Sequence, residues 1–474
     1  MIQTTQPWPD HRSCRTGGSL ALTLVLLSTV AAVGGAPCRI AVVEKGTGWP
    51  VPLVELETVH GVKFVTDNAG VIAFDLPEAM GRETWFGVRG FGYGVPRDGF
   101  GFAGVRLTPT PGGSLSIEVE RTIVARRLGR ITGAGIFGER QKLGQDRDWE
   151  ESGIVGCDSV QTAVVAGRLF WAWGDTSLAH YPLGIFDGTA ARTPPRPLDR
   201  FEPPIRLAFD YHRDVARRPK AIAPMAGDGP TWLTGLATVR DESATERLVA
   251  TFLKIKPPLE TVAVGLCAWN EATERFTPVT TLWSRSGDNQ QPPPTPSGHA
   301  AAWTDADGRD WLLFGNPFPA LRCRATFAAW SDPTAWEVLA PPRRVRSAEG
   351  GEIEPHSGSI AWNEWRGRWV AVFMQKFGKP SAFGELWYCE ADDPLGPWGP
   401  AVKIVSHENY TFYNPKIHSE WSTGDSPILV FEATFTRQFA DAPAPVARHD
   451  YNQVLYRLDL DAAALSPARG KSAR

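Results

Sequence analysis

The stretch SIAWNEWRGRWVAVFM, residues 359–374, shows the pattern that decides the fold. A short strand-like segment, Ser359 to Trp362, passes through a polar turn, Asn363 to Gly367, and returns in a more apolar segment, Arg368 to Met374. Two such segments joined by a tight polar turn predict an antiparallel β-hairpin.

The same pattern recurs along the chain. The other four hairpins span residues 158–173, 232–254, 299–314 and 415–432, and each is followed by further strand-like sequence. The region 146–460 therefore holds five units of roughly 63 residues, somewhat longer than a WD-type blade. Radial repetition of short antiparallel sheets protects their edges and needs no helices. The sequence predicts an all-β chain with a five-bladed β-propeller; a large sandwich, or two stacked sandwiches, is the alternative.

A different pattern precedes the propeller. Residues 38–120 alternate apolar and polar positions between turn signals, which predicts a small β-sandwich. Residues 121–145 are predicted to be a linker with a lead-in strand, and residues 461–474 a disordered tail.

The composition limits the function. The chain has 474 residues, of which 42% are hydrophobic and 21% charged, so it is neither a disordered chain nor a bundle of membrane helices. Its net charge of -3 provides no excess of positive charge that would attract nucleic acid or an anionic membrane. We expect a monomer that binds neither. The 19 Trp residues include candidates for stacking on sugar rings, although most of them are expected in the core.

The N-terminal sequence predicts export. Arg12 and Arg15 precede an apolar run from Leu20 to Val33, followed by small residues up to Ala36. The run is shorter than the roughly 20 apolar residues needed to cross a bilayer, so residues 1–36 are predicted to be a secretion signal. We therefore expect the protein to be secreted or periplasmic. An uncleaved anchor is the alternative. The scattered cysteines lack the spacing of a zinc site and are predicted to be isolated buried thiols. One disulfide between two of them is the alternative.

Polar residues gather at one end of the predicted blades. The first strand of each hairpin starts where the second ends, so these points share one rim, named here the polar rim. Carboxylates there interrupt apolar runs and must be paired, hydrogen-bonded or solvated, because burying a lone charge is costly. The residues predicted for the polar rim are Asp158, Asp175, Lys254, His299, Asn316, Glu354, His356, Gln375, Asn414, His418, Glu432, Tyr451 and Asn452.

Two resemblances follow from these residues. In the N-terminal region, residues 52–56 and 66–74 resemble two strands and a turn of the carboxypeptidase regulatory-like sandwich, a module that implies bracing or binding rather than catalysis. Residues 146–460 resemble the five-bladed propeller superfamily of arabinanases, xylosidases, levansucrases and invertases. There, Gly156-Cys157-Asp158-Ser159 matches the position of the catalytic base, and Glu354-Pro355 that of the general acid.

The match to that superfamily has one gap. The third hairpin opens with Ser297-Gly298-His299, where arabinanase-type enzymes carry a carboxylate that tunes the acid; Asp175 or Glu432 is the candidate replacement. The pair Gly156-Cys157-Asp158 and Trp173-Gly174-Asp175-Thr176 is more similar still to an endo-D-arabinanase branch of the same architecture.

The resemblance implies a glycoside hydrolase acting on a polysaccharide. Cleavage needs a proton donor and a second carboxylate, so Asp158 is predicted as base or nucleophile and Glu354 as acid, with Asp175 and Glu432 raising the acid's pKa. No cofactor or catalytic metal is expected, although a structural ion such as calcium near the axis is compatible with His418. A carbohydrate-binding propeller without activity, and a polysaccharide lyase, are the alternatives. The predicted sugar-binding residues are His299, His356, Asn414, His418, Tyr451 and Asn452.

Overall fold

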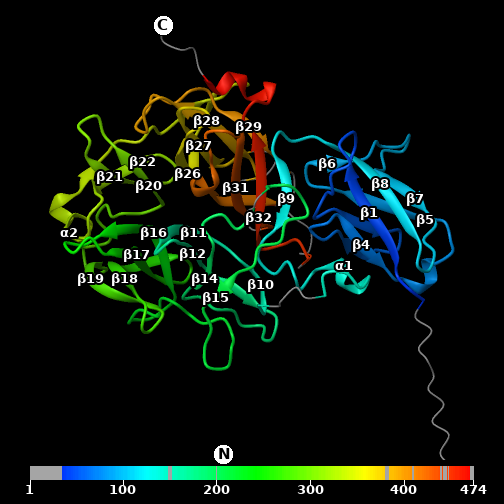
Figure 1. Cartoon of the computed structure of the whole chain (residues 1–474), viewed down its shortest axis with the longest axis horizontal. Helices are drawn as coiled ribbons and strands as arrows, with labels where there is room; N and C mark the ends of the chain where they lie inside the picture. Colours follow the sequence, from blue (N-terminus) through cyan, green and yellow to red (C-terminus); the bar gives the residue numbers. More distant parts are fainter. Residues whose placement is uncertain are drawn as a thin grey trace, which may run out of the picture. The chain divides into compact units, whose positions relative to one another are not determined.

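The computed structural model describes residues 35–147, 152–198, 200–378, 384–407, 410–437, 440, 446 and 448–469. Almost all regular structure in these residues is β-strand (Figure 1). The predicted secretion signal falls almost wholly on residues 1–34, outside the described residues. In the described ranges, no helix has the length and apolar character to cross a membrane.

The first eight strands form two four-stranded sheets, with the orders β4-β1-β8-β6 and β3-β2-β5-β7. Side chains from both sheets, including Ile40, Phe74 and Phe86, share one buried core. Two sheets that face a common core make the predicted β-sandwich. The strands are β1 (Cys38–Glu44), β2 (Glu55–Thr58), β3 (Lys63–Val65), β4 (Val71–Phe74), β5 (Thr84–Arg89), β6 (Tyr93–Gly94), β7 (Gly104–Leu107) and β8 (Ser114–Arg121).

The rest of the described chain contains five four-stranded antiparallel sheets, one for each predicted hairpin. We number them as blades 1 to 5. Blade 1 is β11 (Gln161–Val165), β12 (Arg168–Trp173), β14 (Thr189–Thr193) and β15 (Asp210–Tyr211); blade 2 is β16 (Thr231–Arg240), β17 (Glu246–Lys256), β18 (Glu260–Asn270) and β19 (Arg275–Ser284); blade 3 is β20 (His299–Thr304), β21 (Asp310–Gly315), β22 (Pro319–Arg324) and β23 (Glu337–Val338). Blade 4 is β26 (Pro355–Asn363), β27 (Arg368–Gln375), β28 (Leu386–Ala391) and β29 (Val402–Val405); blade 5 is β30 (Thr411–Ile417), β31 (Ile428–Thr436), β32 (Asn452–Asp459) and β9 (Arg126–Arg130).

Blade 5 closes the ring. Its outermost strand, β9, precedes blade 1 in the sequence and pairs antiparallel with β32 from the end of the chain. Figure 1 shows the two strands side by side, one cyan and one red. The lead-in segment thus joins the two ends of the propeller by hydrogen bonds instead of a covalent link.

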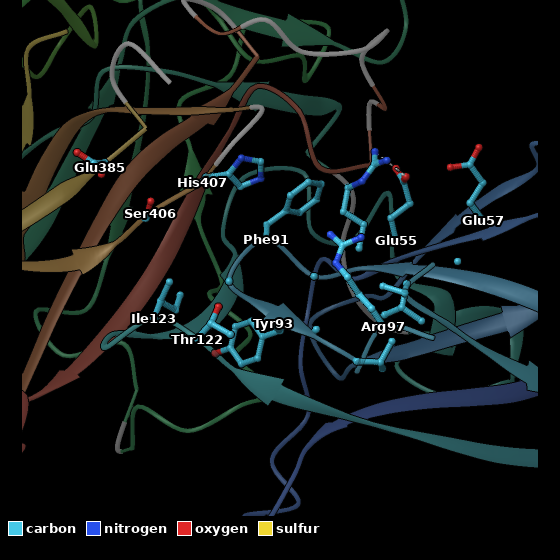
Figure 2. Close-up of a pocket in the computed structure, with 18 of the residues that line it drawn as sticks. Glu55, Glu57, Phe91, Tyr93, Arg97, Thr122, Ile123, Glu385, Ser406 and His407 are labelled. Carbon is cyan, nitrogen blue, oxygen red and sulfur yellow. Dashed lines mark hydrogen bonds and ion pairs between the residues drawn. The ribbon is translucent and has the colours of Figure 1, made fainter. Parts of the chain in front are cut away.

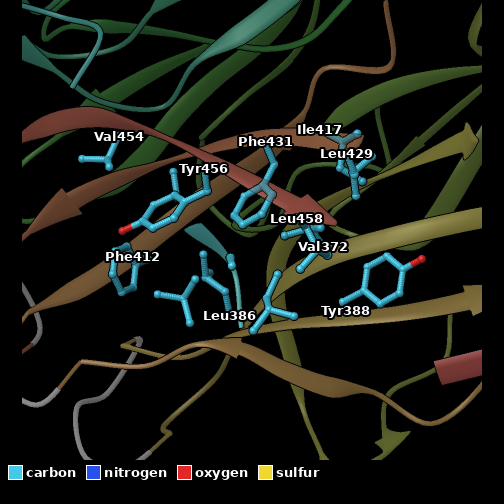
Figure 3. Packing of buried hydrophobic residues seen from close by; sticks show 14 of the residues in the cluster. Val372, Leu386, Tyr388, Phe412, Ile417, Leu429, Phe431, Val454, Tyr456 and Leu458 are labelled. Carbon is cyan, nitrogen blue, oxygen red and sulfur yellow. The ribbon is translucent and has the colours of Figure 1, made fainter. Parts of the chain in front are cut away.

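Buried clusters between successive blades confirm the circular order. Phe170 of blade 1 packs with Leu248 of blade 2, and similar clusters join blades 2 and 3, and 3 and 4. Figure 3 shows the cluster between blades 4 and 5, in which Val372 and Tyr388 meet Phe412 and Phe431. A fifth cluster joins blade 5 to blade 1. Because the series returns to its start, the described strands form the predicted five-bladed β-propeller.

The remaining elements are short. They are α1 (Glu139–Lys142), α2 (Phe327–Ser331), the 3-10 turns η1 (Pro77–Ala79), η2 (Pro333–Ala335), η3 (Ser419–Trp421) and η4 (Ala463–Arg469), and the ribbons β10 (Ile154–Cys157) with β13 (Thr176–Leu178) and β24 (Val345–Arg346) with β25 (Glu352–Ile353). The prediction of a disordered tail is wrong for η4, because its apolar side chains Leu465 and Ala468 are fully buried. The five described cysteines are buried, unpaired thiols.

The sandwich contacts the propeller through β9. The guanidinium of Arg127 is fully buried and donates to three backbone oxygens of the sandwich, those of Pro52, Gly90 and Phe91, at 2.7–3.0 Å. Asn68 bonds both the backbone N–H and the C=O of Arg130. The strand that closes the propeller is therefore also the strand that holds the sandwich.

Candidate active site

Two carboxylates lie next to each other at the polar rim of blade 1. In the β10–β13 ribbon Cys157 pairs with Thr176, so Asp158 follows one strand where Asp175 precedes the other. Asp158 N donates to Asp175 O at 3.2 Å, and Gly174 N donates to Asp158 O at 2.9 Å. A Cβ atom at position 174 would collide with Asp158 Oδ1, so a larger residue there would displace this carboxylate.

Asp158 is half-buried and bound by tyrosines from blade 5. The hydroxyl of Tyr413 donates to Asp158 Oδ2, and Tyr451 also hydrogen-bonds this carboxylate. Burial raises the pKa of Asp158 to about 7; the neighbouring Asp175 adds to the rise, and the hydroxyl donors oppose it. The carboxyl group is therefore about half protonated near neutral pH, as a general acid or base requires.

Asp175 has a different partner. The indole Nε1–H of Trp232, at the start of β16 in blade 2, donates to Asp175 Oδ1 at 3.0 Å. Burial raises the pKa of Asp175, the indole donor opposes that rise, and Asp187 adds to it. The two carboxylates thus lie on one short ribbon, but their partners come from the two blades that flank blade 1.

Hydrogen bonds continue this arrangement around the polar rim. The amide of Asn414 in blade 5 donates to Ser159 Oγ at 2.7 Å, and its backbone N–H donates to Ser357 Oγ of blade 4 at 3.1 Å. Gly358 N of blade 4 donates to Asn316 Oδ1 of blade 3 at 2.9 Å. Starts of first strands and ends of second strands meet here, as the predicted rim geometry requires.

Glu354 lies in a different setting from Asp158. Its carboxylate is exposed and accepts a hydrogen bond from Lys376 Nζ at 2.8 Å, and this bond lowers its pKa. A general acid needs a raised pKa, so this setting does not favour the acid role for Glu354, which stays a prediction. His356, two residues further along, is exposed beside it.

Glu432 and His418 do not lie at the polar rim, so their predicted position was wrong. β30 spans Thr411–Ile417 and β31 ends at Thr436, whereas the sequence hairpin began at Pro415 and ended at Glu432. The predicted rim was therefore displaced by four residues along both strands. His418 follows the far end of β30, and Glu432 lies within β31.

Together these two residues form a fully buried cluster. His418 Nε2 and Glu432 Oε1 are 2.9 Å apart, and His418 Nδ1 is 2.9 Å from Glu420 Oε1. Burial alone would lower the pKa of His418, but the two carboxylate bonds outweigh it and raise the pKa. The ring also stacks on Trp421 at 4.0 Å. This geometry fits a structural role in holding blade 5 against blade 1.

Two other predicted sugar-binding residues are also buried. His299, at the start of β20, is only 6% exposed, and burial with the nearby Lys416 lowers its pKa well below the usual value. Asn452 is fully buried and donates to His449 O at 2.6 Å. Of the predicted substrate-binding set, Asn414 and Tyr451 are the two that join the Asp158 site.

Neither Trp232 nor Tyr413 is among the predicted site residues. Both stand near the start of a first strand, at the level of the polar rim. That position was the available signal for each. Their contacts with the carboxylates could not be foreseen, because 57 residues separate Trp232 from Asp175 and 255 separate Tyr413 from Asp158.

A hollow of about 1150 Å³ lies between the sandwich and strands of blade 4, and Figure 2 draws the residues that line it. Two of its acidic residues already have cationic partners: Glu55 contacts Lys63 and Arg89, and Glu385 contacts Lys403 at 2.9 Å. Phe91 stacks on His407 at its inner end. Because these carboxylates are neutralised internally, the hollow is a weaker catalytic candidate than the Asp158 site.

Among the residues that the structure describes, no group of three or more His, Cys, Asp and Glu side chains is arranged to hold a metal ion. The ion near the propeller axis stays a prediction.

The fold and the site together define a five-bladed β-propeller protein with a carboxylate pair at its polar rim. No protein-family model matches the chain, and no curated protein matches it. Among solved structures, it is similar to the exo-1,5-α-L-arabinanase from a bovine ruminal metagenomic library, at 10% identity over 65% of this chain and 94% of that one, with a TM-score of 0.39.

Two further solved structures are similar at the same level. The endo-arabinanase from Bacillus licheniformis shows 11% identity over 65% of this chain and 96% of its own, with a TM-score of 0.34. The exo-β-1,3-galactanase from Phanerochaete chrysosporium shows 10% identity over 66% and 62%, with a TM-score of 0.37. At these values the likeness assigns no activity, so the function is argued from the site itself.

Proposed function

We propose that the protein is a glycoside hydrolase that cleaves a polysaccharide with Asp158 and Asp175. One observation carries the proposal: two half-buried carboxylates flank the same end of the β10–β13 ribbon at the polar rim, where tyrosine hydroxyls bond Asp158 and an indole bonds Asp175, and the pKa of Asp158 is raised to about 7. Neighbouring acids in different environments are typical of acid–base catalysis.

In this proposal Asp158 is the proton donor. Glycosidic cleavage requires a protonated acid at the leaving oxygen and an ionised carboxylate that activates water or attacks the sugar. Asp158, with its pKa of about 7, holds a proton in much of the population at neutral pH. Burial raises the pKa of Asp175, but the Trp232 indole can only donate, so its bond to this carboxylate favours the ionised form and opposes that rise. The proposal therefore gives Asp158 the role of acid, whereas the sequence predicted it as base or nucleophile.

The lyase alternative is less well supported. A lyase acting on an acidic sugar needs cations that face its substrate. Lys254, the lysine predicted for the polar rim, is 3% exposed and donates to Met225 O, Gly229 O and Thr231 Oγ1. Those three bonds use its donors within the protein.

The test is a screen of purified protein against plant, algal and bacterial polysaccharides, in which reducing ends and ultraviolet absorbance are read together. Asp158→Asn and Asp175→Asn should each lower kcat at least about a hundredfold. Asp392→Asn is the matched control, since this side chain is 88% exposed. New reducing ends without absorbance support hydrolysis. Absorbing products indicate a lyase, and binding without cleavage indicates the non-catalytic propeller.

A further inference from the structure

The segment between β13 and β14 exposes apolar side chains beside the carboxylates. Tyr181 and Leu183 are each 61% exposed and Phe186 is 42% exposed, all within six residues. Burying such side chains is favourable, so a cluster of them on a surface marks a binding site more often than chance.

Backbone hydrogen bonds fix this segment next to Asp175. Thr176 N donates to Ile185 O at 2.9 Å, and Ile185 N donates back to Thr176 O at 2.8 Å. A Cβ atom at Gly184 would collide with Thr176 O, so the return strand requires glycine at this position. The segment therefore leaves β13 and returns to the residue that follows Asp175.

Its far end is anchored at the same site. Thr231 N donates to Asp187 Oδ1 at 2.7 Å, one residue before the Trp232 that bonds Asp175. At its outer turn Ala179 N donates to Gly153 O at 2.8 Å. Because a strand rises about 3.3 Å per residue, Leu178 lies about 10 Å beyond Asp175 along the ribbon.

The charge of the segment limits the class of ligand that it can bind. Residues 176–188 read TSLAHYPLGIFDG and contain no Lys or Arg, so they offer no fixed cation to an acidic sugar. An exposed tyrosine ring instead matches the apolar face of a neutral sugar ring.

We propose that residues 179–186 form a glycan-binding subsite, with Tyr181 as its stacking platform, and that the substrate is a neutral polysaccharide chain that extends from the carboxylates over this segment. The inference rests on the proposed function. It predicts that substrates reaching past the cleaved bond bind more tightly than short ones.

The experiment compares Tyr181→Ala with wild type on the polysaccharide cleaved in the screen and on a short oligosaccharide of the same linkage. KM for the polymer should rise about five- to tenfold, with kcat and the short-substrate kinetics unchanged. Phe100→Ala is the matched control, because that aromatic side chain is 90% exposed in the sandwich. Binding of the same polymer to Asp158→Asn, with and without Tyr181→Ala, measures the subsite without turnover.

The outcomes separate the two proposals. An unchanged polymer KM and unchanged binding in Tyr181→Ala overturn the subsite and leave the hydrolase intact. An equal rise in KM for short and long substrates also overturns it, since the effect is then not one of chain length. Cleavage that persists in Asp158→Asn and Asp175→Asn overturns the proposed function, whatever Tyr181→Ala does. Cleavage confined to acidic polysaccharides overturns the neutral substrate class.

Discussion

Replacing Tyr413 with phenylalanine should move the pH at which activity is lost. The Tyr413 hydroxyl donates to Asp158 Oδ2 and so favours the ionised carboxylate, which means that its removal raises the pKa of Asp158 above about 7. A hydrogen bond to a charged group contributes about 1.5–3 kcal/mol, and one pKa unit corresponds to about 1.4 kcal/mol. Since Tyr451 also bonds this carboxylate, we expect a shift of about one unit.

The assay is kcat/KM on the cleaved polysaccharide from pH 4 to about 9. If Asp158 donates the proton, activity falls as pH rises through its pKa. That fall should lie near pH 7 in wild type and near about pH 8 in Tyr413→Phe. Trp232→Phe is the matched control, because its indole bonds Asp175 and its loss should shift only the acidic limb, upward.

Two results would refute this reasoning. A basic limb that stays in place in Tyr413→Phe would show that Asp158 does not set it. Activity that rises with pH through 7 in wild type would show that Asp158 acts ionised, as base or nucleophile.

Three further predictions concern residues outside the proposed catalytic pair. Glu354→Gln should leave kcat within about twofold because this carboxylate is exposed and ion-paired, and a loss above about tenfold would restore it as the acid. His418→Ala should lower the free energy of unfolding by about 3–5 kcal/mol in urea titrations, since it leaves Glu432 buried without its partner. The control His60→Ala, at an exposed histidine, should change the free energy of unfolding by less than about 0.5 kcal/mol. Arg127→Met should cost about 2–4 kcal/mol by the same measurement, because three buried carbonyls lose their donor, and a loss under about 1 kcal/mol would contradict that account.

The fold was predictable because its signal is local. Each hairpin shows its turn and its apolar second strand within about 20 residues, and five repetitions indicate the ring. The structure keeps the predicted turns at 166–167, 305–308 and 363–367 between strands of the same blade. The polar rim followed from the same logic, which is why Asp158, Asp175, Asn414 and Tyr451 meet where the pattern placed them.

The chemistry of each acid was less accessible, because it depends on partners from other strands. The fifth hairpin shows how a local error spreads. The first strand was predicted to start four residues too late, so His418 and Glu432 were assigned to the polar rim although they lie in a buried cluster. The ion pair of Glu354 was missed for a different reason. Pro355 pairs with Gln375, so the register sets Glu354 against Lys376, and a full register of that hairpin would have shown the ion pair.

Ring closure and assembly of the site are the same structural event. Asp158 leaves β10 on the blade 1 side of the closure, whereas Tyr413 and Tyr451 come from blade 5 on the other side. Arg130 of the closing strand bridges the two: its guanidinium donates to Val155 O, in β10, at 2.7 Å and to Arg448 O, before Tyr451, at 2.6 Å. The pKa of Asp158 depends on burial and on these tyrosines, so an open ring would leave a solvated carboxyl group with an ordinary pKa. The noncovalent closure therefore supplies the environment in which Asp158 can hold a proton near neutral pH.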